Sequence, residues 1–297
     1  MTRLLLLLAC LLLVTACASS KDSRPPVEQQ AERLLERGVF AYQQGDALTA
    51  SHHFTRALVR YQGFDQREGQ LEAHLNLATS LLQLGRLEAA EDQARTAEHL
   101  ALALKKPKHQ QQALWLRARR AWLAEEVDLS LRHLEKLLNN QEQRPEAAVE
   151  LSALALGARI TLHLTEDRTW LYRFQQQLAD QPSPAHQLQL RRLLAWQTWL
   201  EGDFPTAVLE LEAVLAIYRQ QAWRPGLAAT LDELGQLHQQ QGALDQAEDY
   251  FQRALRIRLQ LQDRHQARKL LLNLASLYAA QGRKDQEMAA LEQAARL

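Results

Sequence analysis

Tryptophan and arginine are the residues of this sequence whose types and spacing favour a chemical role, and that role is binding. Both side chains are enriched at binding hot spots, and a guanidinium over an indole gains about 0.5–2 kcal/mol from cation–π attraction. At about 100° per residue, several of them lie on one face of consecutive helices. The residues that share this face are Tyr42, Trp115, Arg119, Trp122, Arg159, Arg192, Trp196 and Trp199. We therefore expect them to form a groove for a partner segment or a glycan.

Catalytic and metal-binding patterns are weak. The ten histidines are scattered, and adjacent His52 and His53 point to different sides of a helix. His163 and Glu166 have a spacing compatible with a metal, but no third ligand lies near them in the sequence. No His-Glu-x-x-His motif or glycine-rich phosphate loop is present. We expect no enzyme activity, no metal and no cofactor.

A forty-residue period positions the candidate binding residues. A residue in the turn between two expected helices recurs at intervals of 40, with a single step of 37. These positions are Gly45, Gly85, Glu125, Thr165, Gly202, Gly242 and Gly282. The chain is 46% apolar and lacks runs of β-branched residues, so helices are expected throughout. The period then predicts seven helical hairpins that bury their apolar faces against one another.

Short strings recur with this period. Phe54-Thr-Arg-Ala-Leu58 matches Phe251-Gln-Arg-Ala-Leu255, and Gly38 and Gly235 stand at equivalent positions where two helices approach closely. Over residues 28–297 the pattern resembles the tetratricopeptide repeat (TPR), in its variety of about forty residues. The resemblance implies an all-α, right-handed α-solenoid of about seven hairpins whose hollow side binds other proteins. It also places the Trp and Arg face on that hollow side.

The middle repeats, residues 111–187, depart from the pattern. Glu125 and Thr165 replace the turn glycine, and Trp170 occupies a slot that holds alanine in other repeats. We expect repeat four to be looser or differently angled, either through drift or because it is a specialised binding segment. The tryptophans of repeats three to five then have two interpretations: they line a groove, or they fill gaps in an irregular core. Asn76 and Asn273 share an offset at which related repeats hold a peptide backbone, but the other repeats lack it.

The N-terminus has the features of a secretion signal. Arg3 precedes eleven apolar residues, Leu4 to Val14, too few to cross a bilayer, which needs about 20. Val14-Thr15-Ala16-Cys17 resembles the lipobox of bacterial lipoproteins, which implies that residues 1–16 are removed and Cys17 is acylated. Residues 17–27 then form a polar tether. Cys10 is a weaker acceptor, and an ordinary secretory signal with an incidental thiol is the alternative.

The resemblance to lipoproteins implies a location and a class of function. Ala18, rather than Asp, follows Cys17, which favours the outer membrane, with the protein facing the periplasm. The leading interpretation is a palmitate-anchored scaffold that binds proteins of an envelope assembly, such as pilus or secretin assembly, outer-membrane assembly, or control of peptidoglycan synthesis. The alternative is a direct binder of glycan strands or peptides through the Trp/Arg groove. Thirty-five basic and thirty-five acidic side chains give no general attraction to nucleic acid.

The last helix, Lys284 to Leu297, ends the chain without the extra polar helix that usually shields a terminal repeat. Met288, Leu291 and Ala294 are expected to present apolar surface to solvent. This end should therefore dock a partner or a second copy of the chain.

Overall fold

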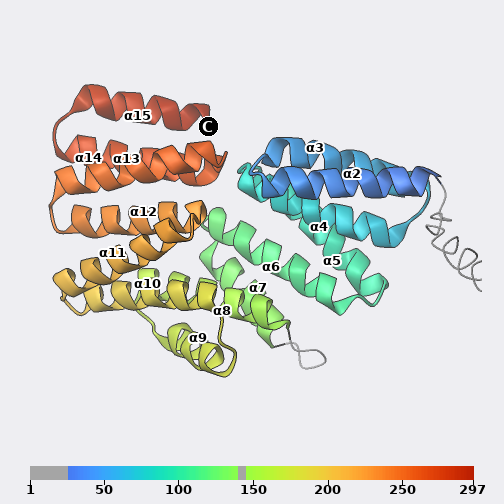
Figure 1. The fold of residues 1–297 in the computed structure, drawn as a ribbon, viewed down its shortest axis with the longest axis horizontal. Helices are drawn as coiled ribbons and strands as arrows, with labels where there is room; N and C mark the ends of the chain where they lie inside the picture. Colours follow the sequence, from blue (N-terminus) through green and yellow to red (C-terminus); the bar gives the residue numbers. More distant parts are fainter. Residues whose placement is uncertain (1–25, 140–144) are drawn as a thin grey trace, which may run out of the picture.

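The computed structural model describes residues 26–139 and 145–297 (Figure 1). Residues 1–25, with Cys10, Cys17 and nearly all of the expected leader and tether, lie outside the described residues. Within the described ranges the chain forms fourteen α-helices and no strand. They are α2 (Pro26–Gln43), α3 (Ala47–Gly63), α4 (Arg67–Gln83), α5 (Leu87–Ala103), α6 (Pro107–Leu123), α7 (Val127–Leu138), α8 (Ala147–Thr165), α9 (Thr169–Asp180), α10 (Pro184–Leu200), α11 (Phe204–Gln220), α12 (Arg224–Gln240), α13 (Leu244–Gln260), α14 (Arg264–Ala280) and α15 (Lys284–Arg296).

Consecutive helices pair as seven hairpins, from α2–α3 to α14–α15, and each hairpin packs on the next along the chain (Figure 1). The predicted all-α solenoid of about seven hairpins is confirmed. Most helices are 17 residues long, whereas α7 and α9, the second helices of repeats three and four, have 12 residues each. The irregularity expected in the middle repeats is therefore a shortening of their second helices.

The turns show that the backbone repeats about every twenty residues, not only every forty. A left-handed residue with positive φ follows most helices, both within hairpins and between them. These residues are Gly45, Asp65, Gly85, Lys105, Glu125, Glu166, Gly202, Ala222, Gly242, Gln262 and Gly282. Only glycine adopts this conformation without a cost of about 1–2 kcal/mol. The glycines mark the turns within hairpins, whereas the turns between hairpins hold other residues and were not visible as a glycine pattern. In repeat four the left-handed residue is Glu166, and Thr165, the predicted turn residue, is the last residue of α8.

Two small residues allow the helices of a hairpin to approach. A Cβ atom at Gly38 would lie 2.4 Å from the Phe54 ring, and one at Gly235 would lie 2.6 Å from the Phe251 ring. The predicted close-contact role of both glycines is confirmed. Repeat four meets the same need with a different pair, because a Cβ at Gly157 would lie 2.0 Å from the Trp170 ring. Trp170 therefore does not prevent contact between α8 and α9, because Gly157 provides the space for its indole.

The core runs along the stack in two main clusters that meet at α6. Leu116 belongs to the cluster of α2–α6, and Leu114 belongs to the cluster that continues to α15. Helix α8 is long and apolar enough to cross a membrane by length and composition, with a mean hydropathy of 1.3. In the structure Ile160 and Leu162 of α8 are buried in the second cluster. Its apolar character is accounted for by packing against α7, α9 and α10.

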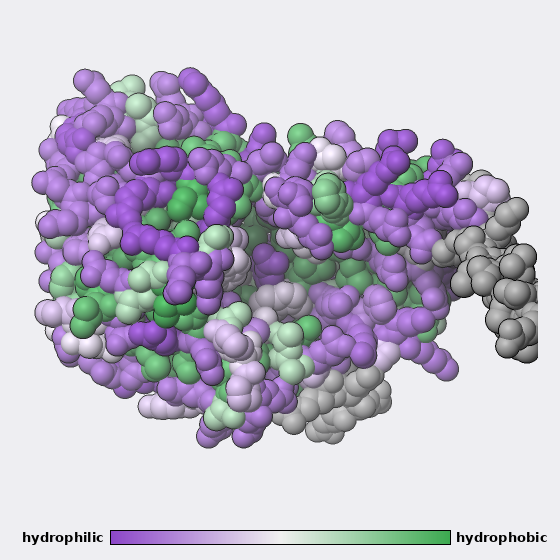
Figure 2. Space-filling view, viewed as in Figure 1, coloured by the Kyte–Doolittle hydropathy of each residue, from purple (hydrophilic) through white to green (hydrophobic). Residues whose placement is uncertain are grey.

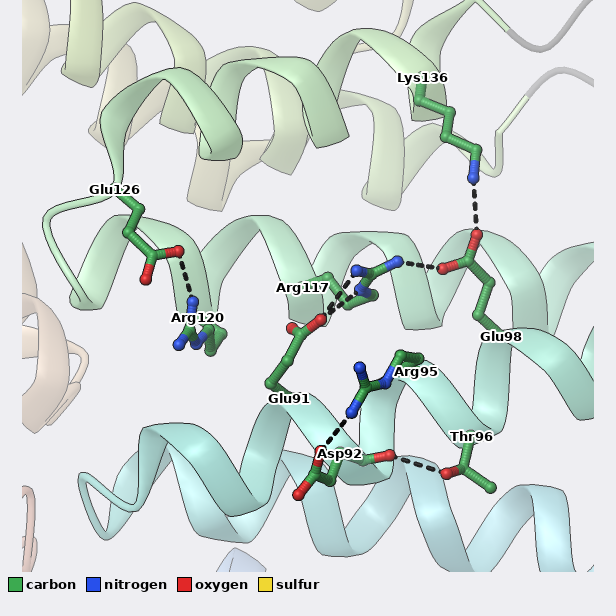
Figure 3. A network of polar contacts seen from close by, with 9 residues as sticks. All are labelled: Glu91, Asp92, Arg95, Thr96, Glu98, Arg117, Arg120, Glu126 and Lys136. Carbon is green, nitrogen blue, oxygen red and sulfur yellow. Dashed lines mark hydrogen bonds and ion pairs between the residues drawn. The ribbon is translucent and has the colours of Figure 1, made fainter.

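A polar network connects repeats two and three (Figure 3). Arg117 of α6 donates to Glu98 of α5 over 2.6 Å and to Glu91 over 2.8 Å, and Lys136 of α7 donates to Glu98 over 2.7 Å. The Glu98 side chain is 4% exposed. Burial alone would raise the pKa of Glu98, but its bonds to Lys136 and Arg117 bring that pKa below its ordinary value. The network joins three consecutive helices through one buried carboxylate.

The two ends of the solenoid meet. Gln83 Nε2, at the end of α4, donates to the carbonyl oxygen of Leu261, after α13, over 2.9 Å. A Cβ at Gly85 would lie 3.6 Å from the Cβ of His265. The turn after α4 therefore contacts the turn before α14, and in Figure 1 the blue helices lie beside the orange ones. This contact closes the superhelix around its hollow side.

The last helix is only partly exposed. Met288 is 62% exposed and Leu291 is 44% exposed, whereas Ala294 is 3% exposed. The expectation that Ala294 faces solvent is wrong, because that face of α15 packs on α14.

Candidate functional site

A cavity of about 280 Å³ lies between the first helices of repeats three to six. These helices are α6, α8, α10 and α12. The residues that line it are Trp115, Arg119, Ser152, Ala155, Leu156, Arg159, Gln189, Arg192, Leu193 and Glu233. The lining thus combines an indole, small and branched apolar groups, three guanidinium groups and one carboxylate.

A second hollow of about 400 Å³ continues the first toward the N-terminus. The two share Trp115 and Arg119. The second hollow is lined by Glu72, Leu75, Asn76, Thr79, His109, Gln112, Trp115, Leu116 and Arg119. We call the two together the inner groove, which runs from α4 to α12. In Figure 2 the surface is hollowed where the N-terminal and C-terminal repeats face each other, and both polar and apolar residues show in it.

The structure brings together four of the eight residues predicted from the sequence. Trp115, Arg119, Arg159 and Arg192 line the same cavity. Tyr42 of α2 is half-buried against the first core cluster. Burial raises the pKa of Tyr42, Arg119 lowers it and Asp263 raises it, so this phenol lies within electrostatic reach of the groove.

The other three tryptophans pack against the core. Trp196 is 5% exposed, and its ring stacks on His163 at 3.9 Å between centroids and lies 5.1 Å from the Trp199 ring. Trp199 and Trp122 are half-buried against the same cluster. Each of the two interpretations therefore holds for some of the tryptophans. Trp115 faces the groove, whereas Trp196 fills the core behind it.

His163 is part of that core. Burial, with the nearby charge of Arg159 as the next cause, lowers the pKa of His163 to about 3, so its ring is neutral at physiological pH. A neutral imidazole stacked on an indole explains why a histidine stands in this apolar helix. Within residues 26–139 and 145–297, no three His, Cys, Asp or Glu side chains come together as a metal site.

A buried ion pair forms one wall of the groove. Arg192 Nε donates to Glu233 Oε2 over 2.7 Å, and the side chains are 11% and 7% exposed. Burial would raise the pKa of Glu233, but the Arg192 guanidinium lowers it below its ordinary value. Glu233 was not predicted as a site residue. Its signal in the sequence is the acidic pair Asp232-Glu233 between Leu231 and Leu234, in a helix that is otherwise buried.

Arg119 and Arg159 have a different environment from Arg192. Neither makes an ion pair with a carboxylate of the described residues, although both line the cavity. The Arg119 guanidinium lies 5.9 Å from the centroid of the Trp115 ring. The groove therefore presents cationic groups and an aromatic face that are available to a ligand.

Residues 226–297 match the tetratricopeptide repeat family. The fold, the closely packed small residues and the match together define a TPR-like helical repeat protein. No curated protein sequence matches the chain.

Solved structures share this fold at low sequence identity. The Rap conjugation regulator of plasmid pLS20, in complex with the Phr peptide, has a TM-score of 0.67 and 16% identity over 82% of this chain and 66% of that protein. Aspartyl phosphate phosphatase F from Bacillus subtilis has a TM-score of 0.67 and 13% identity over 81% of this chain and 62% of that protein. A tetratricopeptide repeat protein from Parabacteroides merdae has a TM-score of 0.51 and 16% identity over 90% of this chain and 93% of that protein. The chain thus spans somewhat less than two thirds of the first two proteins, and the likeness concerns the fold.

Proposed function

We propose that this protein binds a peptide segment of a partner protein along its inner groove. The observation that carries the proposal is the continuous lining from α4 to α12, in which two hollows join at Trp115 and Arg119. A hollow of this size, with a few charged groups among apolar ones, suits an extended segment better than a flat protein surface. The Rap regulator of similar fold was solved in complex with a peptide, which supports a peptide as the ligand here.

Site-specific photo-crosslinking tests this proposal. A photoreactive amino acid at Gln112, which lines the second hollow, is expected to capture partner chains in intact cells. The same group at Tyr172, a 54% exposed residue of α9 outside both hollows, is the control. Equal capture from both positions, or capture from position 172 alone, would contradict binding in the groove.

The N-terminal sequence extends this proposal to the cell envelope. A lipid on Cys17 would hold the solenoid at the periplasmic side of the outer membrane, where it would act as a scaffold for an envelope assembly. Two or more acyl chains anchor a protein stably, whereas one does so only marginally. Cys17→Ser is expected to move the protein from the membrane fraction to the soluble fraction, and mass spectrometry of the wild-type N-terminus should show the acylated cysteine.

The exposed part of α15 supports self-association as a second use of the surface. Met288 and Leu291 present apolar side chains on the exposed face of α15. Met288→Asp should reduce any dimer seen by light scattering. A wild-type chain that remains monomeric at high concentration would contradict self-association.

A further inference from the structure

The inner groove and its rim contain cationic side chains that no carboxylate of the described residues contacts. Five cationic side chains lie there: Arg119, Arg159 and Arg192 line the groove, and the charges of Arg258 and Lys269 interact with that of Arg159 through space. Two of them are paired, Arg192 with Glu233 and Arg258 with Asp263 over 3.0 Å. The remaining three, Arg119, Arg159 and Lys269, form no ion pair with a carboxylate in the described parts of the chain.

The other carboxylates nearby, including Glu72 of the second hollow, form no ion pair with these three cations. Asp232 is 5% exposed and accepts hydrogen bonds from the amides of Gln236 and Asn273, over 3.0 and 3.5 Å. Glu125 is exposed in the turn after α6. Both act on Lys269 only through space. Asp232 and Glu125 therefore offset the charge of Lys269 from a distance, without forming an ion pair with it.

Like charges in the groove repel one another. Burial lowers the pKa of Lys269, and the charge of Arg159 lowers it further, against the opposing effect of Asp232. Arg159, Lys269 and Arg192 also disfavour a proton on His163. An anion placed among these cations would relieve this repulsion.

The rest of the lining restricts what the anion can be. Trp115, Leu156 and Leu193 provide apolar walls beside the arginines. Gln189 lines the same cavity, and its Oε1 is buried without a hydrogen-bond partner among the described residues, so it can accept from a peptide N–H.

We propose that the inner groove selects peptide segments in which an acidic residue stands beside an apolar one. The carboxylate binds to Arg119 and Arg159, and the apolar side chain packs on Trp115 and Leu193. This inference rests on the proposed function and adds the chemical class of the segment.

Panning a library of short random peptides on the detergent-solubilised full chain tests the inference. The library is prepared with amidated C-termini and, in a second arm, with free C-termini. We expect the amidated arm to yield sequences with Asp or Glu next to an apolar residue. A selected peptide should bind about tenfold more tightly than its Glu→Gln counterpart, and the difference should shrink in high salt.

Three variants connect the preference to the groove. Arg119→Gln and Arg159→Gln should each reduce or remove the advantage of the acidic peptide while its Gln counterpart binds as before. Arg256→Gln, which removes an exposed cation of α13 outside both hollows, should leave that advantage unchanged. Circular dichroism of each variant should match that of the wild type, since no ion pair is removed.

The outcomes separate this inference from the proposed function. Peptides selected without an acidic preference, whose binding is lost in Trp115→Ala, overturn the carboxylate assignment and leave peptide binding in place. Selection only in the free-acid arm also overturns it, because a chain terminus is then the ligand. Peptides whose binding is unaffected by Trp115→Ala, Arg119→Gln and Arg159→Gln overturn both proposals.

Discussion

At the scale of single residues, similar side chains have different roles according to their contacts. Trp115 and Trp196 both belong to the predicted Trp and Arg face, yet one borders a cavity and the other is stacked under His163. Arg192 is paired with Glu233, whereas Arg159 is not paired with a carboxylate of the described residues. Sequence spacing determines the helix face, and the neighbouring helix determines whether that face is open.

His163 provides a test of the core behind the groove. Its pKa is about 3 in the folded protein and 6.5 in the unfolded chain. Between these values the unfolded chain binds one more proton, so the free energy of unfolding should fall as pH decreases below 6.5. His163→Phe keeps an aromatic ring on Trp196 and should flatten this part of the stability–pH curve.

Chemical denaturation at a series of pH values measures the effect. His99→Gln, which changes an exposed histidine of α5, is the control and should leave the curve unchanged. If the curve for His163→Phe has the same slope as the wild type, His163 is not buried in its neutral form.

Gly157 provides a second residue-level test. Gly157→Ala places a methyl group 2.0 Å from the Trp170 ring, so we expect a loss of about 1–3 kcal/mol in the free energy of unfolding. The added substitution Trp170→Leu should restore part of that loss. Gly63→Ala has nothing within 4 Å of the new methyl group and should be close to neutral. Additive effects of Gly157→Ala and Trp170→Leu would show that the two side chains do not compete for space.

At the scale of elements, the solenoid is built mostly from helices of 17 residues and from turns that contain a left-handed residue. Asp46 and Asp203 cap α3 and α11 by accepting from the backbone N–H of Thr49 and Thr206, over 3.0 and 3.1 Å. Pro205 lies in the first turn of α11, directly after this cap, where its fixed φ suits the start of a helix. Many turns, however, use a residue other than glycine in the left-handed conformation. The helices, rather than the turn residues, therefore dictate the turn geometry.

This arrangement predicts opposite effects for two exchanges of glycine and alanine. Ala222 has φ 52° and Gly242 has φ 76° at equivalent turns. Ala222→Gly should raise the free energy of unfolding by about 0.5–1 kcal/mol, and Gly242→Ala should lower it by about 1–2 kcal/mol. Thermal denaturation followed by circular dichroism measures both. Effects of the same sign would mean that the turn conformation does not control these positions.

At the scale of the whole molecule, the contact between the turns after α4 and before α14 joins repeat two to repeats six and seven, so the stack is closed by a contact rather than left as an open arc. It depends on the accumulated rotation of every repeat between them. The short helices α7 and α9 lie within that stretch. Closure is therefore a property of the complete stack, and a change in the middle repeats should alter it.

A disulfide tests this closure. The 3.6 Å separation between the Gly85 and His265 Cβ positions lies in the range of natural disulfides. Gly85→Cys with His265→Cys, in a chain with Cys10 and Cys17 replaced by Ser, should form an intramolecular bond under mild oxidation. The pair Gly45→Cys with His265→Cys should not, because nothing lies within 4 Å of a Cβ at Gly45. Non-reducing electrophoresis distinguishes the two, and failure of the first pair to crosslink would mean that the ends remain apart in solution.

The sequence by itself determined the class of fold, the number of hairpins, the turn glycines and the Gly38–Phe54 type of contact. These features depend on a local pattern of residues that recurs along the chain. The sequence also assigned Trp115, Arg119, Arg159 and Arg192 to one helix face through helical geometry, and in the structure these four residues line one cavity. Only the tertiary structure decided that Trp196 is covered, that Glu233 neutralises Arg192, and that the turns near Gly85 and His265 meet. These features depend on the angles between successive helices, which add up over the stack and are not encoded within any one repeat.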